Sequence, residues 1–147
     1  MQQIPNADLK EFLSGNSKTK AAFAKKIGRS FQEIGFLALR GHFLEDKLQD
    51  DLYKEIHSFF KLSNKIKSSY EIKGGGGQRG YTGFGEEHAE GRTTGDLKEF
   101  WHHGPMINET YDPRISKNII VSEISDFNNQ FDLLFNQLNI LGMKVLS

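Results

Sequence analysis

A helix gives way to a strand within the stretch Ile34-Gly35-Phe36-Leu37-Ala38-Leu39-Arg40-Gly41. Before it, apolar residues recur at spacings of four, four and three, which predicts an amphipathic helix with Ser17 as its N-cap. Gly35 stands where a left-handed residue commonly ends a helix. Residues 36–39 are apolar, too few for a helix and bounded by glycines, so they predict a buried strand. The apolar positions of the helix are Phe23, Ile27, Phe31 and Ile34.

Two further long helices follow from the same spacing rule. One is predicted from about Glu45 to Leu62, and a short helical turn is predicted through residues 65–67. The last helix has the longest stripe, with apolar residues three and four positions apart to the end of the sequence. Its members are Ile124, Phe127, Phe131, Leu134, Leu138, Leu141 and Val145. The expected fold class is therefore α+β, with three main helices and two or three short strands.

Glycine dominates the segment from Gly74 to Gly95, which carries nine of the chain's 15 glycines. Residues 75–80 contain a formal dinucleotide-binding spacing, but that motif needs a helix after it, and residues 81–85 are a poor helix start. The segment is interpreted as a long irregular loop, of the kind that often carries function. Residues 97–102 alternate in polarity, which predicts a strand that stops before Gly104-Pro105.

The amino-acid composition argues against several classes of protein. The 147 residues hold 19 basic and 19 acidic side chains, and this balance argues against broad electrostatic binding of nucleic acid. Cysteine is absent, which excludes disulfides and thiolate metal sites. No apolar run approaches the roughly 18 residues of a membrane span. These features predict one cytoplasmic domain that contacts neither nucleic acid nor membrane.

A metal site is one hypothesis for the chemistry. His88 and Glu90 form a His-x-carboxylate pair, and His102 or His103 could supply a third ligand, as in iron(II) sites with two imidazoles and one carboxylate. An Arg-x-Ser at residues 114–116 could clamp a carboxylate. Against this, nothing fixes the loop residues, and His102 and His103 should point to opposite faces of their strand. A solvated loop histidine is the alternative, and we favour it.

A second hypothesis concerns aromatic residues around the glycine-rich loop. Tyr81 and Phe84 are flanked by glycines, so they are candidate exposed contacts for a substrate. Arg79 beside them could pair with an anion, and Trp101 could form a cleft wall. Packing of the loop on its own body is the alternative for all four.

Four blocks in this order resemble a known family. They are Ile34-Gly35-Phe36-Leu37-Ala38-Leu39-Arg40-Gly41-His42, Phe59-Phe60-Lys61-Leu62 with Lys65, Gly80-Tyr81-Thr82-Gly83-Phe84-Gly85-Glu86, and Asp96-Leu97-Lys98-Glu99-Phe100-Trp101-His102. Their kind, order and spacing resemble the N-terminal region of isopenicillin N synthase-like iron(II)/2-oxoglutarate-dependent dioxygenases. The resemblance runs from about Ile4 to the final helix. Phe43 and Ser63 depart from it, since a small residue and a proline are usual at those places.

The resemblance implies a non-haem dioxygenase N-terminal domain over residues 1–147, truncated before the catalytic domain. The strands would extend a double-stranded β-helix, or jelly roll, that is mostly absent from this chain. Fe(II) and 2-oxoglutarate are implied for a full-length member and no cofactor for this chain, because His88, Glu90 and His103 do not occupy the positions of the family's iron ligands. No catalytic and no metal residue is therefore assigned.

The implied function is to support the barrel and to line the substrate entrance, without catalysis by this chain alone. Arg79, Tyr81, Phe84 and Trp101 are the substrate-side residues that the resemblance implies. The expected partners are a small-molecule substrate in the full-length enzyme and either a second copy or a catalytic barrel. Two alternatives remain open at this point: a free-standing binding or accessory module, and a small metalloenzyme using His88, Glu90 and His102 or His103.

Overall fold

The computed structural model describes residues 3–87, 91, 94–108 and 111–146. Over these residues the chain forms five helices and four short strands. They group into two compact units, residues 1–44 with 140–147 and residues 45–139. The three longest helices are α2 (Ser17–Glu33), α3 (Asp46–Phe60) and α5 (Phe127–Leu146). The predicted α+β class with three main helices is therefore confirmed. No described helix has the length and apolar character needed to cross a membrane.

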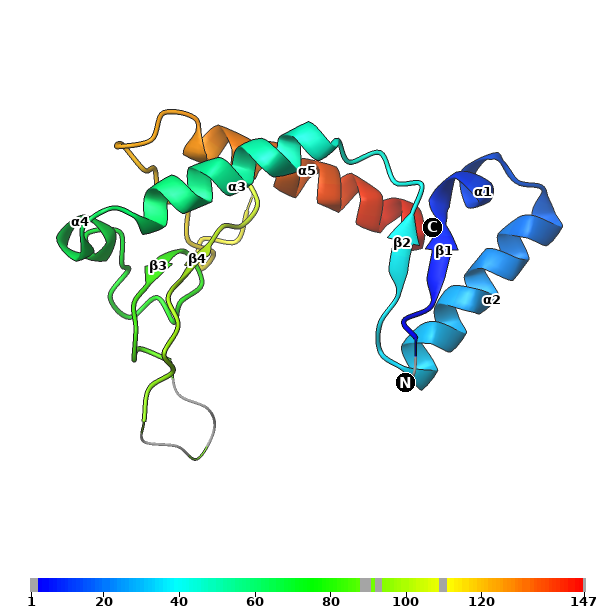
Figure 1. Ribbon diagram of the computed structural model, residues 1–147, viewed down its shortest axis with the longest axis horizontal. Coiled ribbons are helices and arrows are strands. Elements are labelled where there is room, and N and C mark those ends of the chain that lie inside the picture. Colours follow the sequence, from blue (N-terminus) through cyan, green and yellow to red (C-terminus); the bar gives the residue numbers. More distant parts are fainter. Residues whose placement is uncertain (1–2, 88–90, 92–93, 109–110, 147) are drawn as a thin grey trace. The chain divides into compact units, whose positions relative to one another are not determined.

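The first unit is built on a two-stranded parallel pairing (Figure 1). β1 (Asn6–Asp8) pairs with β2 (Ala38–Arg40), and Ala7 lies opposite Leu39. Parallel strands need a crossover, which α1 (Leu9–Ser14) and α2 provide. The buried residues Ala7, Leu9 and Phe23 form its core, and the rings of Phe12 and Phe23 stack at 4.8 Å. Leu141 and Val145 from the end of α5 pack against this core.

Two predictions for this unit need correction. The N-cap of α2 is Asn16 rather than Ser17, because the Asn16 side chain accepts a hydrogen bond from the Thr19 backbone N–H at 3.1 Å. The strand begins at Ala38 and is only partly buried, so the prediction of a buried strand over residues 36–39 is wrong. The Phe36 side chain is 66% exposed. Gly35 does end the helix with a positive φ of 81°, as predicted.

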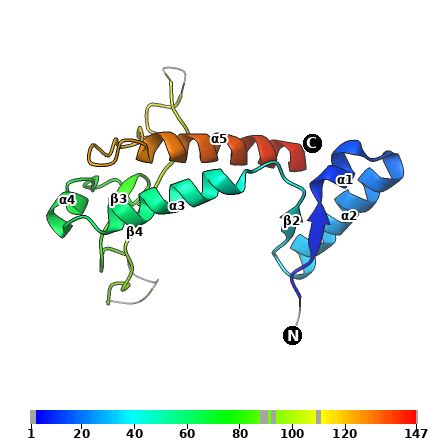
Figure 2. The same ribbon diagram turned by 45° about the horizontal axis from the view of Figure 1, so that its top comes forward.

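The second unit is organised around α3 and α5, which lie side by side in both ribbon views (Figures 1 and 2). The rings of Phe59 on α3 and Phe127 on α5 are 5.2 Å apart, and both side chains are fully buried. The predicted helical turn is present as α4 (Asn64–Ser68). Asn128 fastens the segment before α5, because its side chain accepts from Val121 N at 2.8 Å and donates to Ile119 O at 2.6 Å.

A short antiparallel ribbon completes this unit. β3 (Gly80–Thr82) pairs with β4 (Phe100–His102), and Tyr81 lies opposite Trp101. The predicted strand at residues 97–102 is therefore real but shorter, and Leu97 before it is 93% exposed. β3 was not predicted within the glycine-rich segment. Gly80 has a φ of 75°, and a Cβ there would lie 2.4 Å from Tyr70 O, so this position needs glycine.

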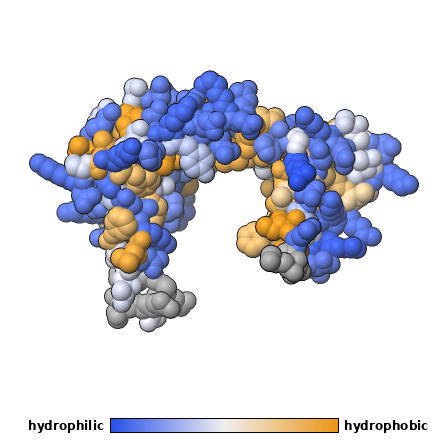
Figure 3. Space-filling model, in the orientation of Figure 1, coloured by the Kyte–Doolittle hydropathy of each residue, from blue (hydrophilic) through white to orange (hydrophobic). Residues whose placement is uncertain are grey.

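The last helix exposes more apolar surface than its predicted stripe implies. Leu138, which belongs to that stripe, is 46% exposed, and four further apolar side chains on α5 are at least half exposed. These four are Leu133, Ile140, Met143 and Leu146. Figure 3 shows apolar patches on a largely hydrophilic surface. A helix with apolar residues around much of its circumference is typical of one that is covered on several sides.

Candidate functional site

The β3–β4 ribbon carries two of the predicted site residues. Tyr81 and Trp101 face each other across the ribbon, and their rings lie 6.0 Å and 4.9 Å from the ring of Phe59. Tyr81 is only 5% exposed, so the prediction that it is an exposed loop aromatic is wrong. Tyr81 is a buried member of the hydrophobic core of this unit, and the partly buried Trp101 packs against that core.

A buried ion pair lies under this ribbon. Lys67 on α4 places its ammonium 2.6 Å from a carboxylate oxygen of Glu99, and the same oxygen accepts the Tyr81 hydroxyl at 2.5 Å. The Lys67 and Glu99 side chains are 5% and 17% exposed. The Lys67 ammonium also lies 5.6 Å from the centre of the Tyr81 ring. These three side chains fix α4 against both strands of the ribbon.

Charge and burial set the protonation states of this group. Burial raises the pKa of the Glu99 carboxyl, but the hydrogen bonds from Lys67 and Tyr81 outweigh it, so this pKa lies below its ordinary value. Burial, followed by the hydrogen bond to Glu99, raises the pKa of the Tyr81 hydroxyl well above its usual range. Glu99 is therefore ionised at neutral pH, and Tyr81 keeps its proton and donates it to Glu99.

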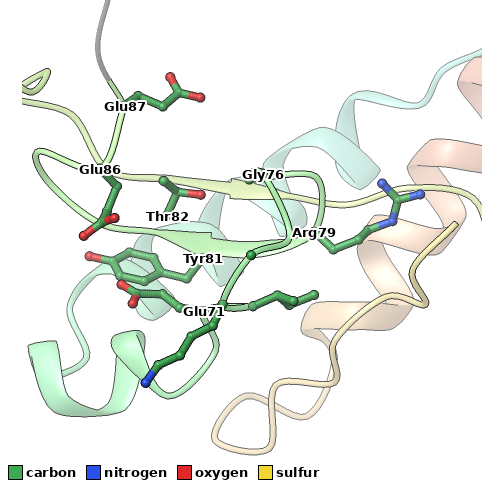
Figure 4. A pocket seen from close by; sticks show the side chains of 11 residues that line it. Glu71, Gly76, Arg79, Tyr81, Thr82, Glu86 and Glu87 are labelled. Atoms are coloured by element: carbon green, nitrogen blue, oxygen red, sulfur yellow. The ribbon is translucent and has the colours of Figure 1, made fainter. Parts of the chain in front are cut away.

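Arg79 and Tyr81 border one hollow of about 490 Å³ beside the ribbon (Figure 4). Its wall also includes glycines of the loop and the acidic side chains Glu71, Glu86 and Glu87. Figure 4 shows that Arg79 extends away from Tyr81 and Glu71. Among the other predicted residues, Phe84 is 59% exposed, and Trp101 borders a second, more open hollow with His102. The structure thus brings Arg79 and Tyr81 to one hollow, without Phe84 or Trp101 in its wall.

His103 connects the end of β4 to α5. Its Nε2 lies 2.7 Å from Asp132 Oδ1 and 3.0 Å from Asn118 Nδ2, and its ring stacks on Phe131 at 5.0 Å. The side chain of His103 is 4% exposed, whereas His102 is exposed. The prediction that these two histidines point to opposite faces is confirmed. Nε2 donates to Asp132 in the tautomer that carries its proton there, and accepts from Asn118 in the other tautomer.

The described residues do not offer a set of iron ligands. In residues 3–87, 91, 94–108 and 111–146, no three histidine or carboxylate side chains are close enough together to hold a metal ion. His88 and Glu90 lie outside the described residues. His103 is engaged with Asp132, and the Arg114 guanidinium donates to Asp112 at 2.9 Å rather than standing free as a clamp. No reaction step is therefore assigned to these side chains.

Several residues that order this region were not predicted. Lys67 sits in a polar helical turn, where the sequence does not distinguish it from the exposed Lys65. A weak signal exists for Glu99, because strand alternation puts it on the same face as Trp101. Asn118 holds the backbone of Gly104 at both its N–H and its carbonyl, and nothing in the sequence pattern marks it.

Comparison with known proteins identifies the class to which this fold belongs. The model of the family DIOX_N, described as "non-haem dioxygenase in morphine synthesis N-terminal", matches residues 4–123. Because this match covers most of the chain, the chain belongs to the non-haem dioxygenase N-terminal family. The resemblance inferred from the four sequence blocks is thereby confirmed.

Relatives and solved structures agree with this assignment. The chain is 28% identical over 120 residues to the 2-oxoglutarate-dependent dioxygenase frbA of Dothideomycetidae sp., covering 74% of this chain and 36% of that protein. A putative 2OG-Fe(II) oxygenase family protein of Caulobacter crescentus superposes with a TM-score of 0.81 at 32% identity, over 99% of this chain and 47% of that one. The chain thus spans less than half the length of these proteins.

A more distant solved structure shares the fold alone. A full-length Neurospora crassa protein, solved in complex with alpha-KG, superposes with a TM-score of 0.76 at 23% identity, over 97% of this chain and 44% of that one.

Proposed function

We propose that residues 1–147 form the N-terminal domain of an iron(II)/2-oxoglutarate-dependent oxygenase, and that this domain does not catalyse alone. The observation that carries the proposal is the family match over residues 4–123. The Caulobacter crescentus superposition supports it, because nearly the whole chain aligns with about half of that protein. Fe(II) with 2-oxoglutarate supplies the oxidising chemistry in such enzymes, and the catalytic β-helix that holds them lies outside these residues.

The second part of the proposal is that this domain supports the barrel and lines the substrate entrance. The residues proposed for the substrate side are Arg79, Tyr81, Phe84 and Trp101. These four residues differ in exposure, so they would contribute to the substrate entrance in different ways. Phe84 is exposed and can contact a small molecule directly. Tyr81 borders the hollow of about 490 Å³ and Trp101 borders the second hollow, so each would shape the wall of its own hollow.

Exposed apolar residues on α5 support a covering partner. Leu133, Leu138, Ile140 and Met143 are each 46–62% exposed. We propose that a catalytic barrel covers these side chains, and that the isolated chain pairs with a second copy instead. Exposed apolar surface of this kind commonly marks a protein–protein contact.

An activity assay on two proteins tests the proposal. The chain alone, supplied with Fe(II), 2-oxoglutarate and dioxygen as the oxidant, should release no succinate above a protein-free blank. A chimera that joins the chain to the remainder of the Caulobacter crescentus protein should release succinate, because the missing ligands are then present. Succinate release by the chain alone, proportional to its concentration, would overturn the proposal.

A further inference from the structure

Arg79 is held in an unusual way for a surface arginine. Its guanidinium lies against the backbone of Gly104, where an added Cβ would come within 2.1 Å of Arg79 Cζ. The Nε atom is buried and has no hydrogen-bond partner in the described part of the chain. One terminal nitrogen donates to the neighbouring Gln78 carbonyl at 2.5 Å. The side chain is therefore fixed in direction while part of its donor set stays unused.

The charge of Arg79 is not neutralised by a described residue. Arg29 and Arg114 each have a carboxylate within 4 Å, from Glu33 and Asp112 respectively, whereas no described carboxylate lies within that distance of Arg79. Arg79 is also half-buried, so its charge has lost part of its hydration. A partly desolvated cation without a counter-charge is unfavourable, and it is commonly found where an anion completes the pair.

Two residues fix the surface on which Arg79 rests. Asn118 accepts from Gly104 N at 2.9 Å and donates to Gly104 O at 2.8 Å, so it clamps this glycine from both sides. Glycine is needed at position 104 because any side chain would occupy the place of the guanidinium. Asn118 thus fixes the Gly104 backbone, and the Gly104 backbone in turn fixes the position of the Arg79 guanidinium.

The acidic residues that border the hollow do not serve as counter-charges for Arg79. Figure 4 shows Arg79 pointing away from Glu71 and Glu86, which gather at the Tyr81 end. The Glu87 carboxylate is engaged by Lys98 at 2.8 Å. The guanidinium therefore lies apart from the carboxylates that border the hollow.

We propose that Arg79 binds the carboxylate of a small molecule, with Gly104 and Asn118 as its positioning residues. The planar fork of a guanidinium matches a carboxylate with two parallel hydrogen bonds. This inference rests on the proposed function for the place of Arg79 at the substrate entrance, and it assigns the substrate class as carboxylate-bearing. It does not depend on turnover, so it is tested on the chain without catalysis.

The test follows the Arg79 Nε–H signal by NMR in the nitrogen-15-labelled chain, with Arg79→Gln to assign it. A buried Nε–H should exchange slowly enough with water to be observed. Sodium benzoate is the probe, and benzamide, which has the same shape without the charge, is the matched control. At constant ionic strength, benzoate should shift the signal in a saturable manner and benzamide should not.

Variants separate binding from folding. Arg79→Gln and Arg79→Lys lack the Nε–H, so their benzoate binding is followed at the backbone N–H signals of residues 79 and 80. Arg79→Gln should lose saturable benzoate binding there. Arg79→Lys, which keeps the charge but not the fork, and Gly104→Ala should each weaken binding about tenfold. Gly28→Ala, where an added Cβ meets nothing within 4 Å, should bind as the unaltered chain does. A shift that is linear and equal for benzoate and benzamide, or undiminished binding by Arg79→Gln, would overturn the inference and leave the proposed function standing.

Discussion

Phe127→Ala should remove about 3 to 5 kcal/mol from the free energy of unfolding, which is a large part of the stability of a small domain. The Phe127 side chain is fully buried, and its ring lies 5.0 Å from Trp101 and 4.9 Å from Phe131 as well as 5.2 Å from Phe59. Truncation would leave a cavity where α3, α5 and β4 meet. Chemical denaturation monitored by circular dichroism measures the loss.

The matched control for Phe127→Ala is Phe84→Ala, which makes the same change at a side chain that is 59% exposed. It should alter the free energy of unfolding by no more than about 0.5 kcal/mol. Equal losses in the two variants would show that Phe127 does not lie in the core of this unit.

Lys67→Met should cost about 3 kcal/mol, because it leaves the Glu99 carboxylate buried without its counter-charge. We take the lower end of the usual range since Glu99 keeps 17% of its side-chain exposure. Lys65→Met, at an exposed position of the same helix, should be nearly neutral. Adding Glu99→Gln to Lys67→Met should recover much of the loss, and a double variant as unstable as the single one would contradict the pairing.

The contribution of the Lys67–Glu99 ion pair to stability should decrease at acidic pH. The pKa of Glu99 is lower in the folded chain than in the unfolded chain, so its contribution is present above the unfolded value of about 4.3. That contribution is lost as the pH falls through the lower, folded value. The stability difference between the unaltered chain and Lys67→Met should therefore shrink in acid, which denaturation at pH 7 and at pH 3 measures. An unchanged difference would mean that Glu99 is not the partner.

The long helices could be predicted from sequence because their apolar spacing is a local property. The short elements could not. β3 lies among glycines, and Tyr81 is buried only because Trp101 and Phe59 come to it from distant parts of the chain. The N-cap of α2 was misplaced by one residue since both Asn16 and Ser17 are good caps, and the side-chain contact to Thr19 decides between them.

The candidate site was predictable in part. The sequence singled out Arg79 as an anion-binding candidate, but not the glycine on which it rests. The sequence pattern marks Gly104 only as a strand stop, since its need for glycine comes from the approach of Arg79 across the ribbon. Asn118 and Lys67 act through tertiary contacts, chiefly with Gly104 and Glu99, and polar residues of this kind leave no periodic signal.

An anaerobic calorimetric titration of the purified chain with Fe(II), with 2-oxoglutarate present, tests the central claim most directly. If this chain is the non-catalytic N-terminal domain of an oxygenase, it should bind no stoichiometric Fe(II). One saturable site per chain that disappears in His88→Ala would contradict the account, because the iron-binding residues would then lie in this domain.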